Sequence, residues 1–314
     1  LRLDRNAIAD LEPIVASLVG PLEHLHLNNN AIAEFMPLSG IQSLRGLYAQ
    51  NNSVKNLALR DLPELSDVRL QRSGIQQIDF DNLPSLFSID LGGNDLEDIG
   101  HLADFMAAQS NPNGWHFNLW LYENGIEDIG PLAQVERLSH IDLQDNVIRD
   151  ISPLKSKSDV WHLNLERNHI SVLGDTFDAY RIGANIYLDG NVLLCSEISN
   201  LENSAANFQW NGDCGEDGDG DGIPDAKDAF ANDIAASIDV DGDGQPDEWN
   251  LGFGQADSTT GLVLDSDDDN DGVPDEDDVF PNNPSESLDS DGDGVGDNGD
   301  AYPEDATRQS LELD

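Results

Sequence analysis

The last third of the chain carries aspartates at a spacing that could bind metal ions. The pattern D-x-D-x-D-G-x-x-D occurs four times, and each copy is followed three residues later by another Asp or by Asn. Side-chain oxygens at the first, third and fifth positions of such a loop converge on one point, and glycine at the sixth position permits the sharp turn. A backbone carbonyl at the seventh position and side chains at the ninth and twelfth complete a shell of about six to eight oxygens, as Ca²⁺ prefers.

The pattern therefore predicts a set of calcium ligands in each copy, with the seventh residue acting through its main chain. These ligands are Asp217, Asp219, Asp221, Ile223, Asp225 and Asp228; Asp239, Asp241, Asp243, Gln245, Asp247 and Asn250; Asp267, Asp269, Asp271, Val273, Asp275 and Asp278; and Asp289, Asp291, Asp293, Val295, Asp297 and Asp300. An all-oxygen ligand set argues against zinc or copper. Mg²⁺ is less suited because it demands stricter octahedral geometry. We expect about four or more Ca²⁺ ions.

Two copies depart from the common pattern. In the second copy Asn250 replaces Asp at the twelfth position and a long insertion, WNLGFGQADSTTGLVL, follows, which puts the last ligand of that loop in doubt. The third copy has two additional acids, Asp265 and Asp268, which could reach a neighbouring ion. The number of ions shared between loops is therefore left open by the sequence.

The loops do not fit an EF-hand, in which a Glu at the twelfth position is flanked by helices. Proline occupies the eighth position in three copies, and the spacers are rich in Pro, Gly and Asp. The phrases DGIPD and DGVPDEDDVFP instead resemble thrombospondin type 3 repeats over residues 215–314. The resemblance implies a chain that wraps around calcium ions with almost no hydrophobic core, with Phe230, Phe280 and Tyr302 making small apolar contacts. A disordered acidic tract then describes the calcium-free state.

The charge of the chain is divided unevenly. The 314 residues have a formal net charge of −47, and residues 215–314 hold 32 acidic side chains against two basic ones. Such a surface repels nucleic acid and anionic lipid at contact range, so we expect no nucleic-acid partner, and anionic lipid is a poor candidate. No apolar run approaches about 18 residues, so nothing within this chain is expected to insert into a membrane.

Residues 1–194 contain a repeat that would form the other part of the molecule. The motif apolar-x-apolar-x-x-Asn recurs with 21 to 24 residues between copies, except for one interval of 30. Each short apolar-x-apolar segment predicts a strand, and a parallel stack of strands would bury the leucines as one core. The Asn after each strand can satisfy backbone groups of its own turn and the adjacent one. The Asn-equivalent positions are Asn6, Asn30, Asn52, Ser73, Asn94, Asn124, Asn146, Asn168 and Asn191.

This repeat resembles the leucine-rich repeat family, and most closely its 22-residue class in bacterial internalin-type proteins. The resemblance implies an α/β-type repeat solenoid with a parallel sheet on the concave face. Serine at position 73 departs from the asparagine ladder and predicts a local weakening. In the 30-residue interval, Leu102, Phe105 and Met106 lie at helical spacing, which predicts a short helix on the convex side and then a turn at Asn111–Gly114.

The segment after the last repeat contains both cysteines of the chain, Cys195 and Cys214. Two cysteines are compatible with one disulfide or with free buried thiols. They bracket a helix-like segment with Ile198 and Leu201, followed by Phe208 and Trp210. This is similar to a leucine-rich-repeat C-terminal cap closed by a disulfide. We therefore expect three regions: a solenoid over 1–194, a disulfide-closed cap over 195–214, and calcium-binding repeats over 215–314.

Strand alternation predicts which side chains face solvent on the concave sheet, and six of them are candidates for ligand binding: Tyr48, Trp120, Tyr122, His140, His162 and Tyr187. Exposed Trp and Tyr are over-represented at binding hot spots. His140 and His162 on adjacent strands could form a pH-sensitive or metal-binding patch. The alternative is that these rings pack on one another across strands and bind nothing.

No nucleophile with a base and an orienting group is evident, and no Gly-rich phosphate loop follows a strand. The sequence therefore favours a non-enzymatic bacterial recognition or adhesion protein, secreted or on the cell surface, with a protein or glycan on the concave face and the calcium repeats as a rigid spacer. The chain starts within a repeat and ends at Asp314 as if entering a fifth loop, so we expect a longer protein. The main alternative is accordingly a targeting and linker region of a larger secreted enzyme. An intracellular phosphatase-regulator type of solenoid is disfavoured by the calcium loops and the cysteine pair.

Overall fold

The computed structural model describes residues 1–109, 114–197, 206–210 and 214–306. Contacts group the chain into two units, Leu1–Cys214 and Gly215–Asp314. Three predicted features lie wholly or partly outside the described residues: the turn at Asn111–Gly114, the apolar pair Ile198 and Leu201, and the final ligand Asp314.

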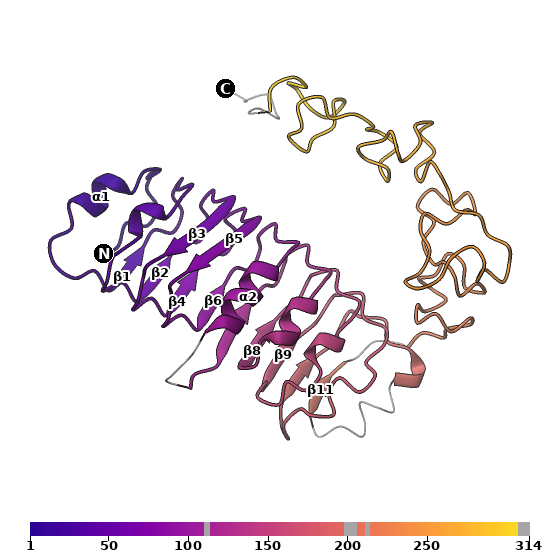
Figure 1. Cartoon of the computed structure of the whole chain (residues 1–314), viewed down its shortest axis with the longest axis horizontal. Helices are drawn as coiled ribbons and strands as arrows, with labels where there is room; N and C mark the ends of the chain where they lie inside the picture. The colour runs from indigo at the N-terminus through magenta and orange to yellow at the C-terminus, as the bar shows by residue number, and fades with distance from the viewer. Residues whose placement is uncertain (110–113, 198–205, 211–213, 307–314) are drawn as a thin grey trace. The chain divides into compact units, whose positions relative to one another are not determined.

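The first unit is a solenoid built on a nine-stranded parallel sheet (Figure 1). Neighbouring strands pair in one constant register, so that Ile141 lies beside Leu163, which in turn lies beside Ile186. Among the described strands, a bulge at Phe117 and Asn118 is the one interruption of this register. The first repeat contributes a single bridge, Arg2 to His26. The strands are β1 (His24–His26), β2 (Gly46–Tyr48), β4 (Asp67–Arg69), β6 (Ser88–Asp90), β7 (Phe117–Trp120), β8 (Leu138–Asp142), β9 (His162–Asn164), β10 (Asn185–Tyr187) and β11 (Asn207–Gln209).

The central apolar residue of each strand points into the core. The row formed by these residues is at most 1% exposed, and it consists of Leu25, Leu47, Val68, Ile89, Leu119, Ile141, Leu163 and Ile186. Burying one such side chain contributes about 1.5 to 3 kcal/mol relative to leaving it in water. The residues on either side of each central position lie on the opposite face of the sheet, because successive side chains in a strand alternate.

A ladder of buried and half-buried asparagines joins most repeats to the repeat before. Asn146 donates from Nδ2 to the carbonyl of Leu143 in its own repeat at 2.9 Å and to that of Leu121 in the preceding repeat at 3.0 Å. Its Oδ1 accepts the N–H of Ile126 at 3.1 Å. The same three bonds occur at Asn30, Asn52, Asn94, Asn124, Asn168 and Asn191.

The ladder changes at Ser73, as its shorter side chain requires. The Ser73 hydroxyl donates to the Ala49 carbonyl at 3.3 Å, a longer contact than the asparagines make. The N–H of Val54, which an asparagine oxygen would accept, instead donates to the Ser73 backbone carbonyl at 2.7 Å. The backbone thus replaces part of the missing side chain, and the weakening expected here stays a prediction.

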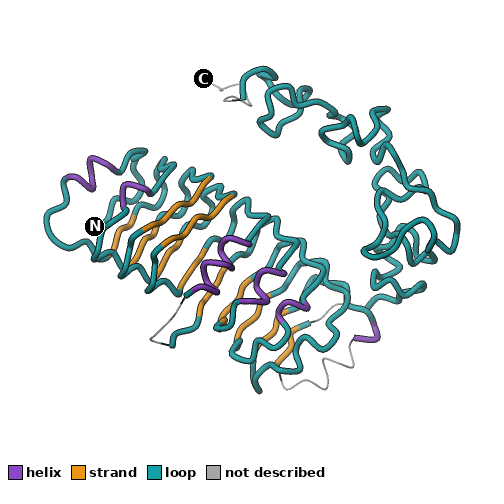
Figure 2. Tube along the Cα trace, in the orientation of Figure 1, coloured by secondary structure: helices purple, strands orange, loops and turns teal. Residues whose placement is uncertain are grey.

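The opposite side of the solenoid is a second layer with few regular helices (Figure 2). It contains a two-stranded parallel sheet, β3 (Asn56–Arg60) with β5 (Gln77–Asp81), that the sequence analysis did not predict. The predicted helix is present as α2 (Gly100–Ala108), and Leu102, Phe105 and Met106 are all buried. The other helices are α1 (Glu12–Ala16) and the 3₁₀ turns η1 (Met36–Leu38), η2 (Gly130–Gln134), η3 (Ser152–Leu154) and η4 (Cys195–Glu197).

The C-terminal edge of the sheet is covered by the cap segment. Strand β11 pairs with β10, and the Phe208 ring packs edge-on against Phe177 at 5.3 Å. A disulfide joins Cys195 to Cys214, whose α-carbons are 4.8 Å apart. None of the helices found among the described residues is long and apolar enough to cross a membrane.

The second unit is stabilised without a leucine core. Residues 216–306 form turns and bends, with neither helix nor strand. Among their buried side chains the apolar ones are small, Ala235 and Ala236 with two prolines, while five aspartates are buried, namely Asp233, Asp265, Asp269, Asp278 and Asp300. Phe230, Phe280 and Tyr302 are half-buried. Charged groups therefore occupy the places that apolar side chains hold in the solenoid.

Candidate calcium loops and the concave face

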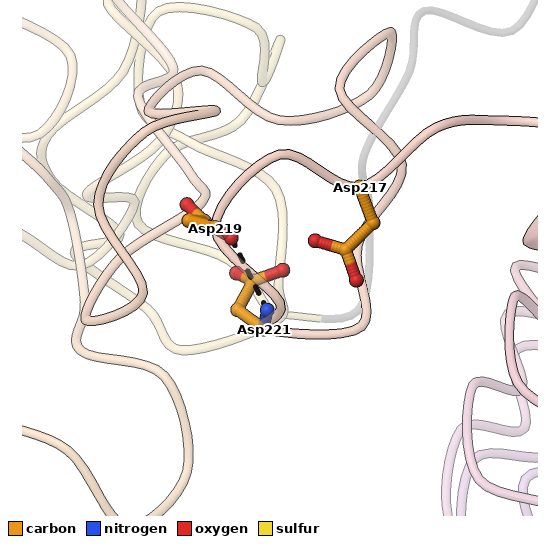
Figure 3. Close-up of side chains that lie close together, drawn as sticks. All are labelled: Asp217, Asp219 and Asp221. Atoms are coloured by element: carbon orange, nitrogen blue, oxygen red, sulfur yellow. Dashed lines mark hydrogen bonds between the residues drawn. The ribbon is translucent and has the colours of Figure 1, made fainter.

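Each acidic loop is folded by its own carboxylates. Asp217 accepts the N–H of Gly220 on Oδ1 at 2.7 Å and that of Gly222 on Oδ2 at 3.2 Å. Asp219 accepts the N–H of Asp221 at 3.1 Å (Figure 3). These bonds turn the chain so that the three carboxylates face one small space.

The same turn is repeated in all four copies. In each, the aspartates at the first, third and fifth positions offer oxygens within 4.8 Å of one another. The glycine at the sixth position has a positive φ of 90° to 97°, a conformation that only glycine adopts without strain. The predicted carboxylates at these three positions are therefore brought together, and they are Asp217, Asp219 and Asp221; Asp239, Asp241 and Asp243; Asp267, Asp269 and Asp271; and Asp289, Asp291 and Asp293.

The ninth-position aspartates and the twelfth-position aspartates each accept a backbone N–H on one carboxylate oxygen. Asp225 accepts the N–H of Gly218 at 2.6 Å, and Asp228 accepts that of Phe230 at 2.7 Å. The equivalent bonds are made by the ninth-position residues Asp247, Asp275 and Asp297 and by the twelfth-position residues Asp278 and Asp300. The seventh residues, Ile223, Gln245, Val273 and Val295, each donate an N–H to the fifth aspartate.

Many carboxylate oxygens in these loops are buried without any hydrogen-bond donor from the described residues. One such oxygen is present on each of Asp219, Asp228, Asp247, Asp265, Asp267, Asp268, Asp269, Asp278, Asp291 and Asp300. A buried charged oxygen without a donor costs several kcal/mol, and a bound cation or protonation would remove that cost. Hard oxygen ligands in flexible loops of this kind suit Ca²⁺. The donor set therefore fits calcium, with one group of ligands per loop.

The crowding of charge shifts the acidity of these groups. Burial, followed by repulsion from Asp221 and Asp219, raises the pKa of Asp228 to about 6. Burial raises the pKa of Asp268 to about 7, with further contributions from Asp275 and Asp247. A bound cation would reverse both effects because it favours the charged carboxylate.

Asn250 does not take the place that the repeat pattern gave it. Its amide nitrogen lies 2.6 Å from Asp221 Oδ2 of the first loop, and its oxygen accepts the Ser237 hydroxyl at 2.8 Å. Both ends of this side chain are thus engaged outside the aspartate group of the second loop. The sequence alone could not reveal this, because Asn250 stands at the twelfth position of the loop, where the motif places a ligand.

On the concave face, four of the six predicted residues form a continuous row of rings. Trp120 packs against His140 with ring centroids 4.7 Å apart, and His140 stacks on His162 at 4.1 Å with an interplanar angle of 4°. His162 then contacts Tyr187 at 5.0 Å. All four rings are half-buried, so each presents part of its surface to solvent. We call Trp120, His140, His162 and Tyr187 the ring row.

The other two predicted residues lie apart from the ring row. Tyr122 covers Gly92 so closely that a β-carbon there would clash with its ring, so this side chain packs on the sheet. Tyr48 stacks on His26 at 4.6 Å, with Arg69 over its ring at 5.6 Å. The sequence analysis overlooked Trp161, which is 46% exposed and contacts both histidines of the row. Its position just before a strand was the available signal.

The two histidines are held in the neutral form. Burial and the neighbouring His162 lower the pKa of His140 to about 4, and burial lowers that of His162. Among the described residues, groups of three or more metal-ligating side chains occur in the four acidic loops and not at these histidines. The row therefore presents an uncharged, largely aromatic surface at neutral pH.

No protein-family model and no curated protein matches this chain. Among solved structures, internalin C2 from Listeria monocytogenes is similar over 61% of this chain and 79% of its own, with 23% identity and a TM-score of 0.48. The leucine-rich repeat domain of LRIM1 is similar over 62% of this chain and 59% of its own, with 22% identity and a TM-score of 0.46. Internalin F from Listeria monocytogenes covers 67% of this chain and 81% of its own, with 20% identity and a TM-score of 0.32. The constant parallel register and the asparagine ladder define the first unit as a leucine-rich-repeat type solenoid.

Proposed function

We propose that this chain is a non-enzymatic recognition protein, secreted or held at the cell surface, whose concave face binds a protein or glycan and whose acidic loops bind calcium. The ring row is the observation that carries the recognition role. Four partly exposed rings on adjacent strands form a rigid, uncharged platform, and rigid aromatic anchors provide much of the binding energy at recognition surfaces. A sugar face or an apolar peptide side chain would stack on such a platform.

Calcium is supported by the ten buried carboxylate oxygens that lack donors. About four ions, one for each group of aspartates, would neutralise the loops and hold their turns together. The bound unit would then act as a rigid spacer, because each loop would be fixed by its ion and not by apolar packing.

Calcium binding of this kind and the disulfide both support an extracellular setting. Calcium loops of the extracellular kind bind at about 10⁻⁴ to 10⁻³ M, which is the concentration range found outside cells. The disulfide between Cys195 and Cys214 is of a type that persists in oxidising compartments.

The recognition role is tested by presenting the recombinant chain to a glycan array and a peptide array in 2 mM CaCl₂, a concentration on the order of the extracellular one. Trp120→Ala removes one end of the ring row and is expected to weaken any interaction on the order of tenfold or more. Trp249→Ala, a tryptophan of the second unit, is the matched control and should bind as the parent does. Equal binding by the Trp120→Ala chain would remove the ring row as the binding surface.

A further inference from the structure

The second and third acidic loops differ from the common pattern in complementary ways. The second lacks a carboxylate at its twelfth position, where Asn250 stands. The third has two carboxylates that the pattern does not use, Asp265 two residues before its first ligand and Asp268 one residue after it. The equivalent positions of the other three copies carry no acid, being Gly215, Gly218, Ser237, Val240, Ser287 and Ser290.

The path of the chain returns Asp265 to the second loop. The insertion that follows Asn250 is fastened part-way by the buried Asp233, which accepts the Ser258 hydroxyl at 2.6 Å and the Thr260 N–H at 2.8 Å. The insertion ends where the N–H of Asp265 donates to the Pro246 carbonyl at 2.9 Å. Pro246 is the residue before Asp247, the ninth ligand of the second loop.

The carboxylate of Asp265 is buried and incompletely satisfied. Asp265 is only 8% exposed. Its Oδ1 accepts the N–H groups of Ser266 at 2.6 Å and Asp267 at 3.1 Å, whereas Oδ2 is buried with no donor from the described residues. Asp247 Oδ2 and Asp268 Oδ1 are buried in the same state.

These three carboxylates also lie close enough to repel one another. Asp247 is repelled by Asp265 as well as by Asp239 and Asp241 of its own loop. Asp268 is repelled by Asp275 of its own loop and also by Asp247 and Asp265. The third loop touches the second at a further point, where the Asn270 amide donates to Asp241. Asp265 therefore lies beside the aspartate group of the second loop.

We propose that Asp265, and not Asn250, completes the cation site of the second loop, and that Asp268 is shared between the cations of the second and third loops. This inference rests on the proposed calcium binding, and it specifies which residues bind the cation of the second loop. The ion of the second loop would then fasten both ends of the insertion, so that residues 248–264 form a loop closed by metal.

The test uses calcium uptake by the full chain, measured by equilibrium dialysis against calcium alone at about 1 mM. Asp243→Asn removes a carboxylate of the second loop itself, and its calcium uptake serves as the reference for a chain that has lost the ion of this loop. Asp265→Asn is expected to reproduce that loss, lowering the affinity of one ion on the order of tenfold because one charged ligand is removed. Asp268→Asn is expected to weaken two ions.

The matched controls are Asp277→Asn, which removes an exposed carboxylate nearby, and Asn250→Ala. Both are expected to keep every ion. The double variant Asp243→Asn/Asp265→Asn is expected to lose no more ions than either single variant, since both residues serve one site. A second readout is chymotrypsin cleavage at Leu251 and Phe253, which are exposed within the insertion and should be cut faster in the Asp265→Asn chain than in the Asp277→Asn chain.

Parental uptake in the Asp265→Asn chain, loss of two ions in the double variant, or loss of the second ion in the Asn250→Ala chain would each overturn the inference while calcium binding itself stands. An Asp268→Asn chain that loses a single ion would overturn the sharing of that carboxylate. A parent chain that takes up no calcium would overturn the proposed calcium binding and the inference together. These outcomes distinguish the two proposals.

Discussion

In the solenoid, most of the side chains that lie fully out of solvent are leucines, isoleucines and valines, whereas in residues 215–306 several of the most buried side chains are aspartates. Apolar burial is favourable in itself and needs no partner beyond another apolar group. Carboxylate burial is unfavourable until a cation or a donor completes it. The comparison therefore predicts that one unit folds by its sequence alone, and that the other folds only in the presence of its ion.

Removal of calcium should separate the two units most strongly. In EDTA we expect residues 215–306 to lose their fixed structure, since the clustered carboxylates repel, while the solenoid keeps its sheet. Limited proteolysis and far-ultraviolet circular dichroism, with and without 2 mM CaCl₂ (the order of extracellular calcium), measure both changes. Magnesium at the same concentration is the control. A second unit that resists protease equally in EDTA would contradict the calcium dependence.

A core truncation should act on the solenoid alone. Leu163 is fully buried on β9, between β8 and β10, so Leu163→Ala is expected to lower the free energy of unfolding by about 2 to 5 kcal/mol, as measured by urea denaturation. Val172→Ala, at a position that is 42% exposed, should change it by less than about 0.5 kcal/mol. Calcium uptake should be the same in both variants, and a lower uptake by the Leu163→Ala chain would show that the units do not fold independently.

The asparagine ladder offers a smaller and reciprocal test. Asn146→Ser should cost about 1 to 3 kcal/mol, because the carbonyls of Leu121 and Leu143 each lose one of their two asparagine donors and the N–H of Ile126 loses its acceptor. Ser73→Asn should gain up to about 1 kcal/mol by restoring the ladder where it is weakest. Urea denaturation measures both. A Ser73→Asn chain that is less stable than the parent would show that the residues around Ser73 are packed too tightly to admit an asparagine side chain.

The smallest expected effect is a pH dependence of the solenoid. The pKa of His140 lies at about 4, below its ordinary value of 6.5, because burial and His162 favour the neutral ring. Its contribution to stability is therefore fully present above pH 6.5 and is lost as the pH falls toward 4. Asp90, whose pKa burial raises to about 6, contributes the opposite slope.

Comparison of the parent with His140→Gln isolates the histidine, because Asp90 is present in both chains. Between pH 7 and 5 the parent should lose about 1 kcal/mol more than the variant, a figure reduced for the solvent that reaches the half-exposed ring. Urea denaturation at several pH values provides the curves. Parallel curves for the two chains would show that His140 has an ordinary pKa.

The features of the solenoid that could be predicted from the sequence are those that recur with the repeat. The apolar row and the asparagine ladder recur at one spacing, so the parallel sheet, the α2 helix and the concave positions of Trp120 and His140 could be read directly. The β3–β5 sheet was missed because it depends on two convex segments having the same length and alternation, a coincidence that the repeat does not require. Strand β11 was missed because three residues after the last repeat carry no periodic signal.

The acidic loops were predictable to the extent that they are local. Bonds within one loop, such as those of Asp217 to Gly220 and Gly222, follow from spacing alone. The placement of Asn250 against Asp221 and of Asp265 against Pro246 joins segments that are 29 and 19 residues apart. Such contacts depend on how the insertion folds back, and a motif contains no information about that. The geometry of Tyr122 over Gly92 escaped prediction for the same reason.

The asparagine ladder has a consequence for how this solenoid can change its length. Seven asparagines each donate to a carbonyl of the repeat before and accept an N–H from it, and three of them, Asn124, Asn146 and Asn168, follow one another at 22-residue steps. A deletion or duplication of one complete step would thus rejoin two surfaces that already match in register, hydrogen bonding and core. Recombination within the gene could shorten or lengthen the recognition surface one strand at a time, without passing through a chain that fails to fold.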